Sequence, residues 1–361
     1  MKKLQSTLYV LTLLLIPVTV ILDRVGGVPQ PLLFFLAAVA IFPLAALLVH
    51  ATEQLASYTG DTIGGLLNAT FGNAPELIIA LVALKAGLYD MVKASIIGAI
   101  LANMLLGLGL AFLLGGCRHH TQEFNPAAAR NAVTMMLLAV ISLAIPSTFH
   151  NFVTAETMVQ EQYVNLGVAL VLLATYGLSL VFMLKTHPDF FASSEASAAH
   201  GAKARWSLPR ALVTLLVTSV CVAFMSEILV GAVEETAKTL GLSQAFIGIV
   251  VLAVVGGAAE TSSAVVMGVK NRLDLSVAIA IGSSVQIALF VAPVLVLASY
   301  FIAPEALNLD FGRGLLAAVF LTVMISAMVA GDGRANWFKG VQLITVYVLL
   351  GIMFYFLPGS H

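Results

Sequence analysis

The sequence predicts an all-α membrane protein with eleven transmembrane helices, and two observations carry that prediction. The first is composition: 60% of the 361 residues are hydrophobic and only 10% are charged, whereas soluble domains carry about 25% charged residues. The second is a series of apolar segments, each close to the length of about 20 residues that crosses a bilayer. These segments span residues 6–22, 31–56, 63–84, 91–114, 129–146, 164–184, 208–233, 245–269, 275–298, 314–330 and 337–357.

The connections between the segments predict how the chain is oriented in the membrane. With the N-terminus in the cytoplasm, twelve of the 17 lysines and arginines fall on the cytoplasmic side, as the positive-inside rule requires. The short N-terminus favours a prokaryotic plasma (inner) membrane over a vacuolar one. A net charge of −1 without a basic cluster argues against nucleic acid as a partner. We expect the lipid bilayer as the surroundings, and the sequence leaves a homo-oligomer open.

An internal repeat follows from a constant offset along the chain. Adding 184 to positions in the third and fourth segments reaches like residues in the eighth and ninth, and the matched pairs include Gly72 with Gly256, Glu76 with Glu260 and Asp90 with Asp274. We therefore predict four parts: residues 1–30 (N-terminal helix and loop), 31–186 (first five-helix repeat), 187–207 (cytoplasmic linker) and 208–361 (second five-helix repeat). Because five is an odd number, the two repeats are inverted, an architecture found in secondary transporters.

The stretch Gly64–Glu76 is the most informative part of the chain, because it places an acid inside an apolar segment. A carboxylate at membrane depth is costly unless it faces a cavity and meets a cation or a proton. Pro75 has no N–H group to donate, so the carbonyl of Phe71 loses its helical partner. Freed carbonyls of an interrupted helix can bind cations. The stretch therefore predicts a cation site at a helix break.

The candidate ligands at this depth are all oxygen or amide groups. They are the side chains of Glu76, Glu260, Asn73, Asn103, Ser284 and Gln286, and the backbone carbonyl of Phe71. Such groups suit a hard cation such as calcium, whereas zinc and copper favour nitrogen and sulfur and magnesium sheds water reluctantly. Two carboxylates match the charge of one divalent ion. Asn103 and Gln286 could instead be hydrogen-bonding glue between helices, and Ser284 could be a packing residue; the sequence leaves these alternatives open.

The same two acids suggest the counter-ion. When a divalent ion leaves, two neighbouring carboxylates in an apolar cavity regain neutrality by taking up protons. We therefore predict that Glu76 and Glu260 bind either one divalent cation or protons. Three further acids within or beside predicted segments are weaker candidates for a proton or cation pathway, namely Glu53, Glu234 and Glu227. Glu234 could alternatively form a solvated pair with Lys238, four residues on.

Three stretches resemble the calcium/proton exchangers of the cation/calcium exchanger superfamily: Ala51-Thr-Glu-Gln-Leu, the Gly64–Glu76 stretch, and Ile279-Ala-Ile-Gly-Ser-Ser-Val-Gln-Ile-Ala-Leu-Phe-Val-Ala-Pro293. The resemblance implies eleven helices in two inverted repeats. It also implies cation-binding acids at Glu76 and Glu260. Two positions depart from the family pattern, because Gly257 and Thr261 stand where the family has asparagine and histidine.

The expected function is secondary active transport, not enzymatic catalysis. The protein would exchange cytoplasmic calcium for external protons by alternating access at the two-glutamate site, with calcium as transported substrate and no cofactor. A sodium-coupled calcium exchanger is the main alternative, and a cation channel is a weaker one. An intramembrane hydrolase would need a Ser/His pair or a zinc-type His cluster at depth, and the segments carry neither.

Overall fold

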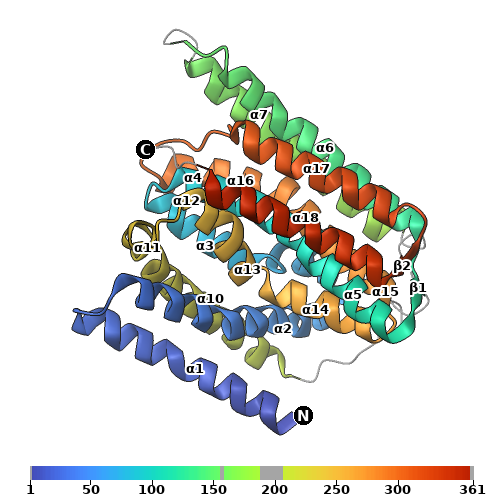
Figure 1. Cartoon of the computed structure of the whole chain (residues 1–361), viewed down its shortest axis with the longest axis horizontal. Coiled ribbons are helices and arrows are strands. Elements are labelled where there is room, and N and C mark those ends of the chain that lie inside the picture. Colours follow the sequence, from blue (N-terminus) through green and yellow to red (C-terminus); the bar gives the residue numbers. More distant parts are fainter. Residues whose placement is uncertain (1, 155–157, 188–205, 358–361) are drawn as a thin grey trace.

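The chain folds into an array of long helices (Figure 1). The computed structural model describes residues 2–154, 158–187 and 206–357. The first half contains α1 (Lys2–Val25), α2 (Gln30–Phe71), α3 (Ala74–Lys85), α4 (Tyr89–Leu101), the π-helical segment η1 (Ala102–Gly107), α5 (Leu108–His119), β1 (Thr121–Glu123), α6 (Pro126–His150), α7 (Met158–Val181) and η2 (Phe182–Thr186). The predicted linker, residues 187–207, lies almost wholly outside the described residues.

The second half of the described chain also consists mainly of long helices and short π-helical segments. It contains α10 (Leu208–Gly231), α11 (Val233–Leu240), α12 (Gln244–Phe246), η3 (Ile247–Leu252), α13 (Ala253–Gly256), α14 (Ala258–Val269), α15 (Leu273–Gln286), η4 (Ile287–Val291), α16 (Ala292–Ile302), α17 (Gly312–Ala330), β2 (Arg334–Asn336) and α18 (Trp337–Phe356).

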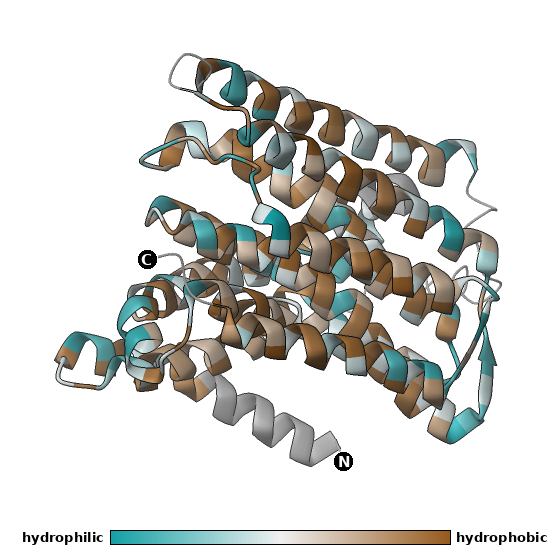
Figure 2. Ribbon diagram, turned by 45° about the horizontal axis from the view of Figure 1, so that its top comes forward, coloured by the Kyte–Doolittle hydropathy of each residue, from teal (hydrophilic) through white to brown (hydrophobic). Residues whose placement is uncertain are grey.

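The helices have the length and apolarity of a membrane protein. Within the described residues, eight helices can cross a bilayer, or nine if the bent pair of α11 and α12–α13 forms one span. Figure 2 shows apolar residues along the outer helices and hydrophilic residues concentrated at helix ends and connections. The helical membrane class is therefore confirmed, whereas the number eleven and the inverted repeat remain predictions.

Helix α2 differs from the prediction. The connection expected at residues 57–62 is wrong, because α2 continues through it as one helix of 42 residues. At about 1.5 Å per residue this helix is about 63 Å long, roughly twice the apolar thickness of a bilayer. Gly60 is tolerated inside a helix at a cost of about 1 kcal/mol. In the second half, Gly241, which lies 181 positions after Gly60, instead adopts a φ of 66°, and the chain bends by 112° between α11 and the following helices.

Several pairings of helices join the first half of the chain to the second. Helix α2 packs along α10, and α5 packs along α18. Glycines allow the second pair to approach closely: a Cβ atom placed on Gly340 would lie 2.6 Å from the carbonyl oxygen of Gly109. A third contact, between α14 and α5, brings the second half against the same helix.

A two-stranded sheet, which an all-α prediction does not include, connects the ends of α5 and α18. Strand β1 pairs antiparallel with β2, and Gln122 lies opposite Ala335. Lys339 stabilises the turn before β2, because its ammonium group donates hydrogen bonds to Asp332 at 2.6 Å and to the carbonyl oxygen of Arg334 at 2.8 Å. The same hydrogen bond from Lys339 holds the pKa of Asp332 below its usual range.

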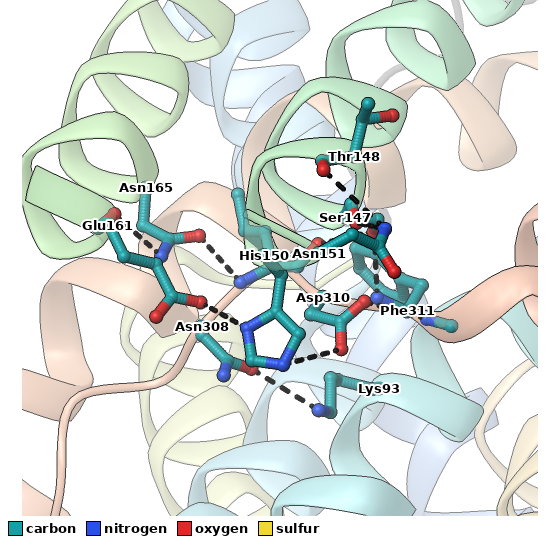
Figure 3. A network of polar contacts seen from close by, with 12 residues as sticks. Lys93, Ser147, Thr148, His150, Asn151, Glu161, Asn165, Asn308, Asp310 and Phe311 are labelled. Atoms are coloured by element: carbon teal, nitrogen blue, oxygen red, sulfur yellow. Dashed lines mark hydrogen bonds and ion pairs between the residues drawn. The ribbon is translucent and has the colours of Figure 1, made fainter. Parts of the chain in front are cut away.

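A polar network holds the connection between α16 and α17 against α6 and α7 (Figure 3). Ser147 Oγ donates to the carbonyl of Leu309 at 3.1 Å and accepts from the N–H of Phe311 at 3.0 Å. Asn165 Oδ1 accepts from the N–H of Leu309 at 2.7 Å. Nearby, both ring nitrogens of His150 face carboxylates. The connection thus finds partners for its buried backbone groups in side chains from the first half.

We expect Ser147→Ala to destabilise the protein by about 1–3 kcal/mol, because it leaves the buried N–H of Phe311 without an acceptor. Thr148→Ala is the matched control, since Thr148 is exposed and donates to the carbonyl of Ala144 within its own helix. Thermal unfolding of the purified protein in detergent measures both. Equal melting temperatures for the two variants would contradict this role of Ser147.

Candidate cation site

Two helix breaks meet in the middle of the molecule. Helix α2 ends at Phe71 and α3 begins at Ala74, while α13 ends at Gly256 and α14 begins at Ala258. The two breaks lie at matching positions when the offset of 184 is applied. The π-helical segments η1 and η4 also fall at matching positions. A Cβ atom placed on Gly256 would lie 2.9 Å from Glu76 Cγ, so the second break touches the acid that follows the first.

Each break places one glutamate in the first turn of the helix that follows it. Pro75 suits the start of α3, where the backbone N–H groups have no partner within the helix. Glu76 follows it, and Glu260 occupies the corresponding turn of α14. A carboxylate near a helix N-terminus interacts favourably with the helix dipole. The same local geometry at the two breaks thus places two carboxylates in the interior.

The two carboxylates are buried and incompletely bonded. Glu76 is 8% exposed and Glu260 7% exposed. Both carboxylate oxygens of Glu76 and Oε2 of Glu260 have no hydrogen-bond partner in the protein. Gly256, four residues before Glu260, lies against Glu76. No lysine or arginine is buried among the residues whose side-chain burial the structure describes, so neutrality at this place requires a cation or protons from outside.

Two buried amides accompany the acids. Asn73 Nδ2 donates to Gln286 Oε1 and so ties the first break to the end of α15. Its Oδ1 atom has no partner and remains a free acceptor. Asn103, on η1, is 1% exposed. Carboxylate and amide oxygens of this kind are ligands for a hard cation. The hydrogen bond between Asn73 and Gln286 joins two helices, which is one of the two roles that the sequence left open for Gln286.

The positions of the other predicted ligands do not distinguish a cation-binding role from a packing role. Ser284 is fully buried, but its hydroxyl donates to the carbonyl of Ala280 at 3.0 Å within its own helix, which is compatible with a packing role. Phe71 is the last residue of α2, directly before the first break. Its carbonyl therefore lies at the break, as expected from the sequence.

The three weaker candidates do not join this cluster. Glu53, Glu227 and Glu234 are exposed side chains on α2, α10 and α11. Glu53 faces His50, with 3.3 Å between Oε2 and Nδ1. In the described part of the chain, no group of three or more His, Cys, Asp or Glu side chains forms a metal-binding arrangement. The central site therefore depends on two acids, supplemented by amides.

A small cavity lies beside Glu76, between α3, α4, η3 and η4. Its volume is about 20 Å³, enough for one water molecule or a small ion. Ser95 is a polar residue of its wall that the sequence analysis did not single out. Its hydroxyl donates to the carbonyl of Val92 at 2.8 Å. A serine in an apolar segment was the available signal, but nothing in the sequence placed it next to Glu76.

The chain matches a known protein family along most of its length. The model of the sodium/calcium exchanger protein family matches residues 29–185 and again residues 210–356. The chain belongs to the sodium/calcium exchanger protein family. Within this family, the Ca(2+)/H(+) antiporter of Aphanothece halophytica is 40% identical over 369 residues, covering 98% of each chain. The Ca(2+)/H(+) antiporter ChaA of Bacillus subtilis is 39% identical over 331 residues, covering 91% of this chain and 93% of that protein.

Solved structures agree with this family membership. The native structure of YfkE matches with a TM-score of 0.84 and 36% identity, covering 97% of this chain and 99% of that one. The H+/Ca2+ exchanger CAX has the same fold, with a TM-score of 0.72 at 14% identity, covering 98% and 89% of the two chains. The resemblance to calcium/proton exchangers that the sequence suggested is thus confirmed.

We expect Asn73 and Gln286 to be energetically coupled, because each supplies the other's hydrogen-bond partner in an apolar interior. In a double-mutant cycle of Asn73→Ala and Gln286→Ala, the coupling should be about 0.5–2 kcal/mol. Unfolding in detergent provides the four free energies. Asn73→Ala combined with Asn165→Ala is the control, and it should be additive because these two residues belong to separate networks. Additivity of the Asn73 and Gln286 changes would count against the bond between them.

Proposed function

We propose that the protein is a secondary active transporter that exchanges cytoplasmic calcium for external protons. The observation that carries the proposal is the pair of buried glutamates, Glu76 and Glu260, with unpartnered carboxylate oxygens and no buried lysine or arginine in the described chain. Two negative charges in such a place match one divalent cation or two protons. Relatives named as calcium/proton antiporters, at up to 40% identity over nearly the full length, support the same assignment.

The calcium ion would be held by oxygen ligands alone. Glu76 and Glu260 supply the charge, and Asn73 Oδ1 and the carbonyl of Phe71 supply neutral oxygens from the first break. Calcium takes six to eight oxygen ligands in flexible geometry, so water completes the shell. We propose Asn103, Gln286 and Ser284, the other ligands predicted from the sequence, as further oxygen donors to the ion. When calcium leaves, a proton binds to each carboxylate, and the site returns to neutrality without a buried charge.

Alternating access follows from the predicted architecture of eleven helices in two inverted five-helix repeats. The family model matches two separate stretches of the chain, and the two helix breaks, as well as the π-helical segments η1 and η4, occur at matching positions in the two halves. These features support a duplicated unit with its site between the copies. We place the N-terminus in the cytoplasm of a prokaryotic plasma membrane, and we assign Glu53, Glu227 and Glu234 to the approaches for calcium or protons.

Calcium uptake into proteoliposomes with an imposed pH gradient tests the proposal. Wild-type protein should take up calcium when the lumen is acidic, and Glu76→Gln and Glu260→Gln should each abolish uptake, because one carboxylate cannot balance a divalent ion. Glu305→Gln is the control, since Glu305 is an exposed acid on the connection between α16 and α17. Uptake that needs a sodium gradient would mean that the counter-ion is sodium and not the proton. Uptake without any gradient would indicate a channel. Wild-type rates in Glu76→Gln would remove the site assignment.

Competition between protons and calcium predicts a pH dependence of binding. Because calcium binds the deprotonated carboxylates, its apparent affinity should rise with pH, by about tenfold per pH unit for each proton that it displaces. The calcium-dependent rise in melting temperature, measured in detergent at several pH values, reports this affinity. An affinity that does not change with pH would mean that protons and calcium do not share Glu76 and Glu260.

A further inference from the structure

A groove lies between α6 and α17, away from the two glutamates. The two helices pack along each other (Figure 1), and α6 begins just after β1 while α17 ends just before β2. The groove has a volume of about 300 Å³. Its lining residues extend from Arg130 to Leu137 on α6 and from Val323 to Ala330 on α17. At 1.5 Å per residue, the groove therefore follows the two helices for about 10 Å.

The groove has a charged end and an apolar remainder. Arg130 lies at the end next to the β1–β2 sheet, and Thr134 is the second polar residue of the lining. The hydroxyl of Thr134 donates to the carbonyl of Arg130 at 2.8 Å within its own helix. The other lining residues are all apolar, namely Val133, Leu137, Val323, Met324, Ala327 and Ala330. An occupant of this groove needs a polar group at one end and a hydrocarbon part along the rest.

Arg130 is positioned by the end of α17. Its Nη2 atom donates to the carbonyl oxygen of Gly331 at 2.7 Å. A guanidinium group has five N–H donors, so this bond leaves several of them for a ligand. In the part of the chain that the structure describes, Arg130 forms no ion pair, and the nearby acid Asp332 pairs with Lys339 instead. The positive charge at the end of the groove is therefore not neutralised by the protein.

The surroundings of the groove are those of a lipid-facing surface. The chain is a membrane protein, and large apolar side chains such as Leu138 on α6 and Met328 on α17 are exposed. Arg130 lies on the side that the positive-inside rule predicts to face the cytoplasm. The cytoplasmic leaflet carries anionic lipids, and basic pockets between transmembrane helices on that side bind their head groups.

We propose that the groove between α6 and α17 binds an anionic phospholipid. The phosphate accepts charge-assisted hydrogen bonds from Arg130, which arginine forms in a forked geometry, and one acyl chain lies along the apolar lining. The bound lipid contacts both helices at the end where the hydrogen bond from Arg130 to Gly331 already joins them. This inference does not depend on which ions the protein transports.

Titration of the delipidated, full-length protein with single lipids, followed by native mass spectrometry, tests the inference. Dioleoylphosphatidylglycerol should bind wild-type protein more tightly than dioleoylphosphatidylcholine, whose choline cation offsets the phosphate. Arg130→Gln should weaken phosphatidylglycerol binding about tenfold, the effect of one lost hydrogen bond to a charged group. Ala327→Trp should weaken the binding of both lipids, because it fills the groove. Arg118→Gln is the matched control, since Arg118 is an exposed arginine at the end of α5 beside the same sheet.

Each other outcome overturns the proposal. Unchanged phosphatidylglycerol affinity in Arg130→Gln would remove the site, and an equal loss in Arg118→Gln would reduce the effect to a general attraction of this end for anions. Displacement of the lipid by glycerol phosphate, which has no acyl chain, would leave a phosphate site without a lipid. A changed number of subunits in Ala327→Trp at unchanged lipid affinity would make the groove a contact between two copies of the chain. If Arg130→Gln does not elute as a single species from a size-exclusion column, Ala327→Trp decides.

Discussion

The cost of two unpartnered carboxylates in an apolar interior is the constraint on which the rest of this structure depends. Glu76 and Glu260 are almost fully buried, and the described interior offers no positive side chain to either. A charge in this situation is retained only where a cation or a proton compensates it. This cost argues against an ordinary helix-packing role for the two acids and supports the proposal that their surroundings admit an ion.

The helix breaks solve the problem of bringing those acids together. A continuous helix would satisfy its own backbone and leave no free ends at this depth, whereas a break exposes a helix N-terminus whose dipole favours a negative side chain. Gly256 allows the second break to lie against Glu76. Asn73, through its bond to Gln286, fixes the first break against α15. The helix breaks and the contacts between helices thus together determine the positions of Glu76 and Glu260.

Much of the site could be predicted from the sequence, because its signals are local. The pattern of Gly72, Pro75 and Glu76 predicts a helix break before an acid. The constant offset of 184 residues predicts a corresponding acid at Glu260. The continuity of α2 could not be predicted, since low hydropathy near Gly60 resembles a connection although nothing there stops a helix. The pairing of β1 with β2 and the contact of Gly256 with Glu76 join segments that are far apart in the sequence, and no local pattern records them.

The pairing of α5 with α18 bears on how the molecule can move. Backbone hydrogen bonds between β1 and β2 join connections whose residues Glu123 and Arg334 are 211 positions apart, and glycine contacts hold the two helices together. Helices α2 and α10 form a second such pair. Each pair takes one member from each half of the chain. A displacement that keeps both pairs intact therefore divides the molecule along a surface between the pairs, and this surface does not follow the boundary between the two halves of the chain.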